Sequence, residues 1–428
     1  MSTGRTALAA VTASILLLAA GAPAGPRAAG GTVSVLAVWG GSELDSFRAM
    51  VKPFEQRTGI TVQYEGTRDL GAVLTSRIQG GHPPDIAALP GPGQIAELAR
   101  ARALVPLAGV VDAKSMAQEY ARTWIDLGSV GGTLYSVFIK TALKGLVWYD
   151  PAALRAAGYR VPATWDALLA LTRRIAAGGT RPWCIGLESG AASGWPATDW
   201  IEVLLLRAAG PAVYERWYLH KIPWTDPAIR TAWERFGTIA TNPAYVYGGT
   251  QAVLATNFAE APFPMLAVPP RCYLHLQATF IEDFLRKQYP AARPGADLDF
   301  FPVPAIDPHF AGAVEVAGDL VGMFRDTPAS RALMRYLVTA EAQAIWVRRG
   351  GALSPNRKVR LADYPDPLSR RAAGILVAAP VARFDASDMM PQAMQSAFYK
   401  AALEYVRNPG RVGDLLAGLE QTARDTYR

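Results

Sequence analysis

Apolar and polar residues alternate with two different periods in the N-terminal third of the chain. Three short apolar runs have the length and composition of buried strands: residues 32–38, 60–64 and 85–89. Each run precedes a segment in which apolar residues recur every three or four positions, as in an amphipathic helix: residues 43–58, 70–78 and 94–102. Gly59 follows the first of these segments and is typical of a helix end. The strand-helix order predicts a parallel sheet covered by helices.

The pattern changes near residue 133. Residues 134–139 and 146–149 have the character of strands, and the rest of the chain is rich in helical periodicity. Six further helices are predicted at residues 165–177, 199–209, 228–240, 274–287, 328–348 and 391–405. Two segments between them are predicted to be extended: residues 299–303 and 315–324. The chain thus leaves the parallel sheet near residue 140 and rejoins it near 305, which predicts several crossings between two lobes.

The first thirty residues have the layout of a secretory signal peptide. They contain no acidic residue, Arg5 gives a positive start, and an apolar run at 7–20 precedes the small-residue motif Ala22-Pro23-Ala24, with Ala28-Ala29-Gly30 as a second cleavage candidate. The run is shorter than the ~20 residues of a spanning helix. An uncleaved N-terminal anchor is the alternative. Because no cysteine directly follows the run, we expect a soluble periplasmic protein without a lipid anchor.

Composition points to a well-packed globular protein. Half of the residues are hydrophobic and only 18% are charged. The length of 428 residues favours two lobes over a single core. The formal net charge is +7, which is mild for this length. The densest basic stretch, Arg357-Lys358-Val359-Arg360, is short and has no interleaved aromatic residues. A nucleic-acid-binding role is therefore not expected.

The only two cysteines are Cys184 and Cys272. An even count in an exported chain predicts a disulfide between them. Two buried thiols are the alternative. A catalytic cysteine is not expected, because no histidine signature accompanies either residue.

Motifs for catalysis, metals and cofactors are weak. Residues 91–96 match G-x-G-x-x-A after a strand, as in a dinucleotide fingerprint, but a glycine loop at a ligand-binding strand end is the preferred interpretation. The four histidines are scattered without metal-ligand spacing, so neither a metal nor a cofactor is expected. Asp385 and Asp388 form a carboxylate pair that nothing marks as an acid and a base. These observations favour a protein that is not an enzyme.

Tryptophans carry the clearest binding signal. Trp39 follows the first strand and precedes two glycines, and Trp183, Trp195 and Trp200 cluster in a glycine-rich stretch. A ring on such a loop can stack against the apolar face of a sugar beside carboxylates that accept hydroxyl hydrogen bonds. Packing is the preferred interpretation for Trp183, whereas both interpretations stay open for Trp39 and Trp195. The glycine and proline that flank Trp195 predict an irregular loop there.

Several longer stretches together resemble one family. They are TVSVLAVWGG with Glu43 after it, PPDIAAL, LVWYDP, PWCIGLESGAASGWPATDW, PRCYLHLQATF and RFDASDMMP. These pieces span nearly the whole chain after residue 30 and resemble the extracellular solute-binding proteins that deliver carbohydrates to ABC importers. The α-glucoside-binding branch is the most similar in these pieces.

The resemblance implies an α/β fold of the periplasmic-binding-protein type, with two lobes, interlobe crossing strands and a central ligand cleft. It assigns residues 1–30 to the signal peptide, 31–140 plus 305–350 to the first lobe, and 141–304 plus 351–428 to the helix-rich second lobe. By analogy, loops lining the cleft supply the ligand-binding residues Trp39, Glu43, Asp85, Trp195, Asp199, Asp319 (beside Gly318) and Arg383. Asp199 could instead cap its helix, and Asp85 could be a turn residue.

The function that the resemblance implies is capture without catalysis. A monomer would bind an α-linked glucoside or oligosaccharide between its lobes and deliver it to the membrane permease of an ABC importer, with no metal or cofactor. A secreted carbohydrate-active enzyme is one alternative. The same binding fold carrying a polyol or a glycerol phosphodiester is another.

Overall fold

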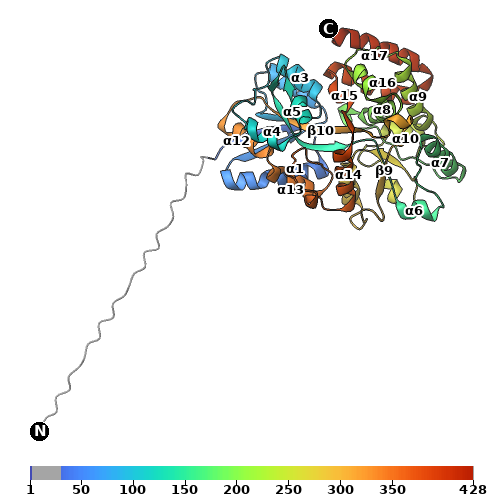
Figure 1. The fold of residues 1–428 in the computed structure, drawn as a ribbon, viewed down its shortest axis with the longest axis horizontal. Helices are drawn as coiled ribbons and strands as arrows, with labels where there is room; N and C mark the ends of the chain where they lie inside the picture. The colour runs from blue at the N-terminus through green and yellow to red at the C-terminus, as the bar shows by residue number, and fades with distance from the viewer. Residues whose placement is uncertain (2–29, 428) are drawn as a thin grey trace.

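The computed structural model describes Met1 and residues 30–427. Figure 1 shows two α/β halves lying side by side, with β10 (Ala313–Met323) running between them. The predicted signal peptide falls on residues that, apart from Met1 and Gly30, lie outside this description. Among the helices of residues 30–427, none combines the length and apolar character needed to cross a membrane.

The first half is built on a six-stranded sheet. Its strands follow the order β11-β10-β3-β1-β2, and β6 also pairs with β10. β1 is parallel to β2 and β3, whereas β10 is antiparallel to β3 and β6 and parallel to β11. The bounds of the other strands are β1 (Thr32–Ala37), β2 (Thr61–Gly66), β3 (Ile86–Leu89), β6 (Ser136–Leu143) and β11 (Val381–Phe384). A separate antiparallel pair of short strands, β4 (Ser129–Val130) and β5 (Thr133–Leu134), directly precedes β6 in the sequence.

The predicted order of strands and helices in the N-terminal third is confirmed. The helices of this half are α1 (Gly41–Thr58), α2 (Leu70–Gln79), α3 (Pro92–Arg100), α4 (Ala113–Glu119), α5 (Arg122–Leu127), α12 (Pro328–Leu337) and α13 (Ala340–Arg349). Gly59 ends α1 in the left-handed conformation, with φ 70°, and its N–H donates to the Glu55 carbonyl. The single helix predicted at 328–348 is wrong: Thr339 starts a new helix there by accepting a hydrogen bond from the Ala342 N–H.

The second half surrounds a small antiparallel sheet in the order β8-β7-β9. Its strands are β7 (Leu146–Tyr149), β8 (His275–Gln277) and β9 (Asp299–Pro302). Its helices are α6 (Pro151–Ala156), α7 (Trp165–Ala177), α8 (Trp195–Tyr218), α9 (Pro227–Ala240), α10 (Gly249–Ala255), α11 (Ile281–Gln288), α14 (Pro367–Ala378), α15 (Ala386–Met389), α16 (Gln392–Arg407) and α17 (Val412–Thr426). The helix predicted at 274–287 is wrong in its first part, because β8 pairs with β7 before α11 begins.

Two features join the halves. β6 ends at Leu143 and leads through Lys144 and Gly145 directly into β7 of the other sheet. β10 pairs with β11, β6 and β3 of the first sheet and also contacts α8 of the second half, and its register with β6 shifts at Asp319. β11 belongs to the first sheet although its residues fall within the range assigned from sequence to the second lobe. The sequence-based lobe limits stay a prediction.

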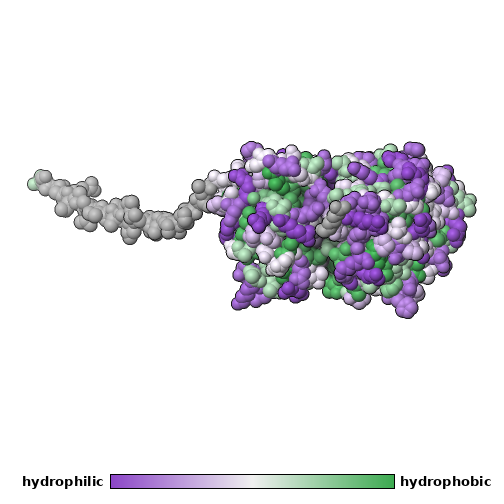
Figure 2. Space-filling view, turned by 90° about the horizontal axis from the view of Figure 1, so that it is seen from above, coloured by the Kyte–Doolittle hydropathy of each residue, from purple (hydrophilic) through white to green (hydrophobic). Residues whose placement is uncertain are grey.

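Most large rings are buried within the halves. Trp183 is fully buried and packs edge-on against Trp200, with ring centroids 4.9 Å apart, in agreement with the packing role expected for Trp183. On the face drawn in Figure 2, hydrophilic side chains cover most of both halves and hydrophobic side chains form only small patches. Scattered patches of this kind are normal on a folded surface.

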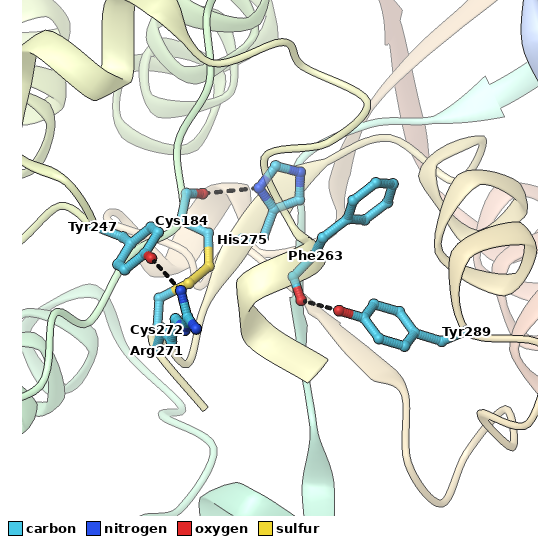
Figure 3. Close-up of a disulfide and its surroundings, with 7 residues drawn as sticks. All are labelled: Cys184, Tyr247, Phe263, Arg271, Cys272, His275 and Tyr289. Carbon is cyan, nitrogen blue, oxygen red and sulfur yellow. Dashed lines mark hydrogen bonds between the residues drawn. A yellow bond between two sulfur atoms is a disulfide. The ribbon is translucent and has the colours of Figure 1, made fainter. Parts of the chain in front are cut away.

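The predicted disulfide between Cys184 and Cys272 is present, and both residues are buried. Figure 3 shows the His275 ring beside it, with Nδ1 directed at the Cys184 carbonyl oxygen at 2.8 Å. The other ring nitrogen, Nε2, is buried and has no hydrogen-bond partner among the described residues. Burial lowers the pKa of His275 to about 4, because a charged imidazole here would be desolvated.

We predict that His275 makes folding less favourable in acid. Since its pKa is about 4 in the folded state and ordinary near 6.5 in the unfolded state, the unfolded chain binds the extra proton first as pH falls between these values. Lowering the pH from 7 to 4.5 should therefore remove ~2 kcal/mol of stability through this residue. Urea unfolding of the parent and of His275→Gln at both pH values measures the difference. An equal acid-induced loss in both proteins would contradict the prediction.

Candidate functional site

A cavity of about 140 Å³ lies where the two halves meet. Its wall includes the segments that follow β1 and β3, which is the edge of the sheet where open α/β proteins bind ligands. Further parts of the wall come from α1, the crossing strands β6 and β10, the start of α8, α15, α16 and several loops. Five of the seven predicted ligand-binding residues line it: Trp39, Glu43, Trp195, Asp199 and Asp319. Gly318 also lines it.

Lys140 holds the first-half side of the cavity together. Its ammonium group lies 2.5 Å from Glu43 Oε1 and 3.0 Å from Asp319 Oδ2, and all three side chains are at most 12% exposed. Glu43 sits in the first turn of α1, where the helix dipole also favours a carboxylate. Asp319 lies at the register shift between β10 and β6, and such irregularities redirect side chains towards sites. A buried ion pair thus links α1, β6 and β10.

Lys144 plays the matching role on the second-half side. Its ammonium group donates to Asp199 Oδ1 at 2.7 Å and to Asp385 Oδ2. Asp199 lies in the second turn of α8, and Asp385 directly follows β11. The alternative that Asp199 caps its helix is wrong, because Gly194 occupies the N-cap of α8. Lys140 and Lys144 were not predicted as site residues, although Lys140 is the one charged residue of the buried strand β6.

Burial and charge pairing set the protonation of these groups. Burial disfavours the ammonium form of Lys140 and Lys144, but the adjoining carboxylates outweigh it and raise both pKa values above the ordinary range. Burial raises the pKa of Asp199 to about 7, against the effect of Lys144. Asp385 is also desolvated, yet Lys144 and its hydrogen bonds lower its pKa. Both lysines are therefore charged at neutral pH.

Two polar atoms on the cavity wall have no hydrogen-bond partner among the described residues. They are Asp199 Oδ2 and Thr141 Oγ1. A buried carboxylate oxygen without a donor is unfavourable, and so is a buried hydroxyl without a partner. A ligand with hydroxyl groups would donate to the first and exchange a hydrogen bond with the second.

Trp195 is half-buried and is the first residue of α8. The predicted irregular loop is wrong here, because Gly194, with φ 108°, and Pro196 start a helix instead. A side chain at Gly194 would also lie 2.4 Å from the Tyr399 carbonyl oxygen. The Trp195 ring packs edge-on against Phe258 at 5.0 Å, and the Lys144 ammonium lies 5.7 Å from its centroid. The indole is thereby held rigidly beside Asp199.

Trp39 contributes differently. Only 1% of it is exposed, and its ring lies 5.0 Å from Phe47 and 5.1 Å from Trp346. Its Nε1–H donates to Asp319 Oδ2 at 3.0 Å. Trp39 is therefore mainly a packing residue that orients a cavity carboxylate, and contact of its ring edge with a ligand stays a prediction.

The structure does not bring Asp85 and Arg383 to this cavity. Asp85 comes just before β3, at the opposite end of the strand, and accepts hydrogen bonds from the Ser34 N–H and hydroxyl at 2.8 and 2.9 Å. Arg383 lies in β11 and pairs with Glu215 of α8 at 3.3 Å. Their predicted ligand contacts have no support from this geometry. The glycine loop predicted at a ligand-binding strand end starts α3 at Gly91 and packs on the second half, because a Cβ there would lie 2.1 Å from the Asp388 carbonyl oxygen.

A larger cavity of about 900 Å³ lies in the first half, between the segments near residues 107–119, 132–134 and 335–339. Its lining contains one arginine, Arg335, two carboxylates, Asp112 and Glu119, and no tryptophan. It lacks residues from the second half. The smaller cavity between the halves is therefore the better candidate for the functional site.

Sequence comparisons with known proteins all point to one family. The sequence model of the bacterial extracellular solute-binding proteins matches residues 40–344, more than half of the chain. The osmoprotective compounds-binding protein GgtB of Synechocystis sp. is 40% identical over 375 residues, which cover 87% of this chain and 88% of the relative. The alpha-glucosides-binding periplasmic protein AglE of Rhizobium meliloti is 37% identical over 403 residues, which cover 92% of this chain and 87% of the relative.

A solved structure shares the fold. The bacterial solute receptor AcbH, described as having an exclusive preference for b-D-galactopyranose, has a TM-score of 0.80 at 19% identity. The alignment covers 93% of this chain and all of that chain. The predicted two-lobed α/β fold is thereby confirmed.

We predict that the ion pairs of Lys140 with Glu43 and Asp319 are needed for the stability of the folded chain. Lys140→Met keeps most of the side-chain volume but leaves Glu43 and Asp319 without their cation, which should cost ~3–5 kcal/mol of unfolding free energy. Lys287→Met is the matched control, because Lys287 forms an exposed pair with Asp45 at 3.3 Å and should lose at most ~1 kcal/mol. Urea unfolding of both variants tests this. Similar small losses would show that Lys140 is not a required counter-ion.

Proposed function

The chain belongs to the family of bacterial extracellular solute-binding proteins, and we propose that it captures a carbohydrate in the cavity between its halves. An α-linked glucoside is the preferred ligand. The observation that carries this proposal is the unpartnered Asp199 Oδ2, held beside the rigid Trp195 ring. An aromatic face and a fixed hydrogen-bond acceptor together match the apolar face and the hydroxyl edge of a sugar ring. The 37% identity to an alpha-glucosides-binding protein supports the linkage.

The size of the cavity favours a small ligand. A volume of about 140 Å³ is below the ~300–1,000 Å³ typical of ligand pockets. A disaccharide or another small glucoside suits it better than a long oligosaccharide. Arg68 lies at the same cavity and stacks its guanidinium 4.8 Å from the Phe258 ring centroid, a contact between the two halves. Parting the halves would break this contact and let the ligand enter.

Charge on the wall argues against an anionic ligand. Five carboxyl groups and three cationic side chains line the cavity, and both lysines are already engaged by carboxylates. A glycerol phosphodiester would therefore have to compete with these carboxylates for either lysine. A neutral polyol or another osmoprotective solute is the second candidate, because the 40% identical relative carries that name. Its hydroxyls could use the same acceptors, without a ring to stack on Trp195.

We further propose that the protein works without catalysis, as a periplasmic monomer that hands its ligand to the permease of an ABC importer. Closure of two lobes around a ligand creates a form that a membrane partner can distinguish from the open form. Capture needs stoichiometric affinity and no change in the sugar. Released monosaccharide during incubation would instead favour a carbohydrate-active enzyme.

We predict that α-linked disaccharides stabilise the protein against heat. A ligand that binds only the folded state adds about 2.7 kcal/mol at a hundredfold excess over Kd, which should raise Tm by several degrees. Maltose, trehalose and sucrose are compared with cellobiose, with mannitol and with a glycerophosphodiester in one melting series. A shift with the phosphodiester and none with any saccharide would overturn the carbohydrate assignment. A shift with mannitol alone would favour the polyol.

We predict that Trp195→Ala weakens binding of the stabilising sugar at least tenfold, which corresponds to ~1.4 kcal/mol. Its unfolding free energy without ligand should change less than that of Trp200→Ala, the matched control. Trp200 is 2% exposed and packs in the core, so its truncation should cost ~3–5 kcal/mol. Calorimetric titration and urea unfolding are measured on both variants. Unchanged affinity with a large loss of stability in Trp195→Ala would assign Trp195 to the core.

A further inference from the structure

Three carboxylates meet just behind the wall of the cavity. They are Glu202 of α8, Glu315 of β10 and Asp385 at the start of α15, and one oxygen of each lies within 4.8 Å of the other two. Each residue is at most 1% exposed. The three come from segments far apart in the sequence, and they converge where β10 enters the second half.

Glu315 is the one of the three carboxylates whose oxygens have no polar partner within residues 30–427. Neither of its carboxylate oxygens has a hydrogen-bond partner among the described residues. The nearby cations are committed elsewhere: Lys144 donates to Asp199 and Asp385, and Arg207 donates to the Ala311 carbonyl at 2.6 Å. A buried carboxylate without a partner costs several kcal/mol, so this arrangement calls for a cation, a proton or a water.

The other two carboxylates are already oriented. Glu202 Oε2 accepts from the Ala386 N–H at 2.7 Å, and Asp385 Oδ1 accepts from the Asp388 N–H at 2.9 Å. The same two oxygens also accept from hydroxyl groups, Glu202 Oε2 from Tyr214 at 3.3 Å and Asp385 Oδ1 from Ser387 at 2.7 Å. Each carboxylate oxygen has two lone pairs, so acceptor capacity remains on the other oxygen of each residue, Glu202 Oε1 and Asp385 Oδ2. Backbone hydrogen bonds to ligating carboxylates are the usual means of holding a metal ligand in place.

Charge in the surrounding region is also out of balance. Asp199 and Asp388 adjoin the three carboxylates, which makes five buried acidic groups against two buried cations, Lys144 and Arg207. Burial, together with the neighbouring carboxylates, raises the pKa of Glu202, Glu315 and Asp388, so these groups favour the protonated form unless a cation is present. A divalent cation would take the place of such protons and balance two negative charges. A bound cation would also link α8, β10 and the start of α15 close to Lys144.

We propose that Glu202, Glu315 and Asp385 form a structural binding site for a hard divalent cation, calcium or magnesium. All three ligands supply oxygen, and no histidine or cysteine belongs to the group, which favours these ions over zinc or copper. Asp385 also lines the proposed sugar cavity, whereas Glu202 and Glu315 lie behind its wall, and the site does not depend on the identity of the ligand.

The test uses the whole chain, stripped with EDTA and dialysed. Calcium chloride and magnesium chloride are titrated separately in calorimetry and in thermal melts, with ionic strength held constant by sodium chloride. We expect one equivalent of calcium or magnesium to bind and to raise Tm by several degrees. Glu315→Gln should abolish this shift, whereas Glu341→Gln, which removes a carboxylate that is 57% exposed on α13, should retain it.

The contrary result is equally clear. If neither salt gives one-site heat or a shift in Tm, and elemental analysis of the untreated protein finds no bound calcium or magnesium, the proposal is wrong and Glu315 is satisfied by a proton or a water. A shift that persists in Glu315→Gln would also overturn it. Should that variant fail to fold, Glu202→Gln and the calorimetry of the parent chain decide the question.

Discussion

Two buried lysines at the crossing between the two sheets hold the architecture together. Lys140 lies within β6 and Lys144 directly follows its last residue, and each ammonium group is shared by two carboxylates. A buried ammonium is tolerated only when its partners are in place, so α1, β10, α8 and the residue after β11 must all reach the strand correctly. The walls of the cavity follow from this constraint. The site is rigid on each side because its charged groups are also the structural links of each half.

The same constraint explains how the protein can bind a neutral solute in a highly charged cavity. Since Lys140 and Lys144 are already neutralised by protein carboxylates, the cavity presents few free charges and keeps hydrogen-bonding capacity at Asp199 Oδ2 and Thr141 Oγ1. The Trp195 ring adds an apolar surface beside these atoms. Solutes rich in hydroxyl groups fit such an environment, whereas ions would have to displace existing pairs. The capture mechanism is inferred from the family, and the class of ligand is inferred from the local pattern of charges.

Much of this could be predicted from sequence because short apolar runs and helical periods are local signals. The first three strands and helices, the disulfide and the cavity placement of five residues came from such signals and from the family resemblance. Asp85 did not reach the cavity because it precedes its strand rather than following it. Trp195 proved to start a helix, since a glycine and a proline serve helix starts as well as loops. Lys140 and Lys144 were missed because their partners lie up to 241 residues away, and no local pattern reports such pairing.

We propose that the solute binds in the cavity between the halves. A crystal structure grown with an α-linked disaccharide would test this most directly. We expect a sugar ring against the Trp195 indole, with a hydroxyl group within hydrogen-bond distance of Asp199 Oδ2 and both lysines still paired. Sugar density in the larger cavity near Asp112 and Arg335, with the space beside Trp195 filled only by solvent, would contradict it.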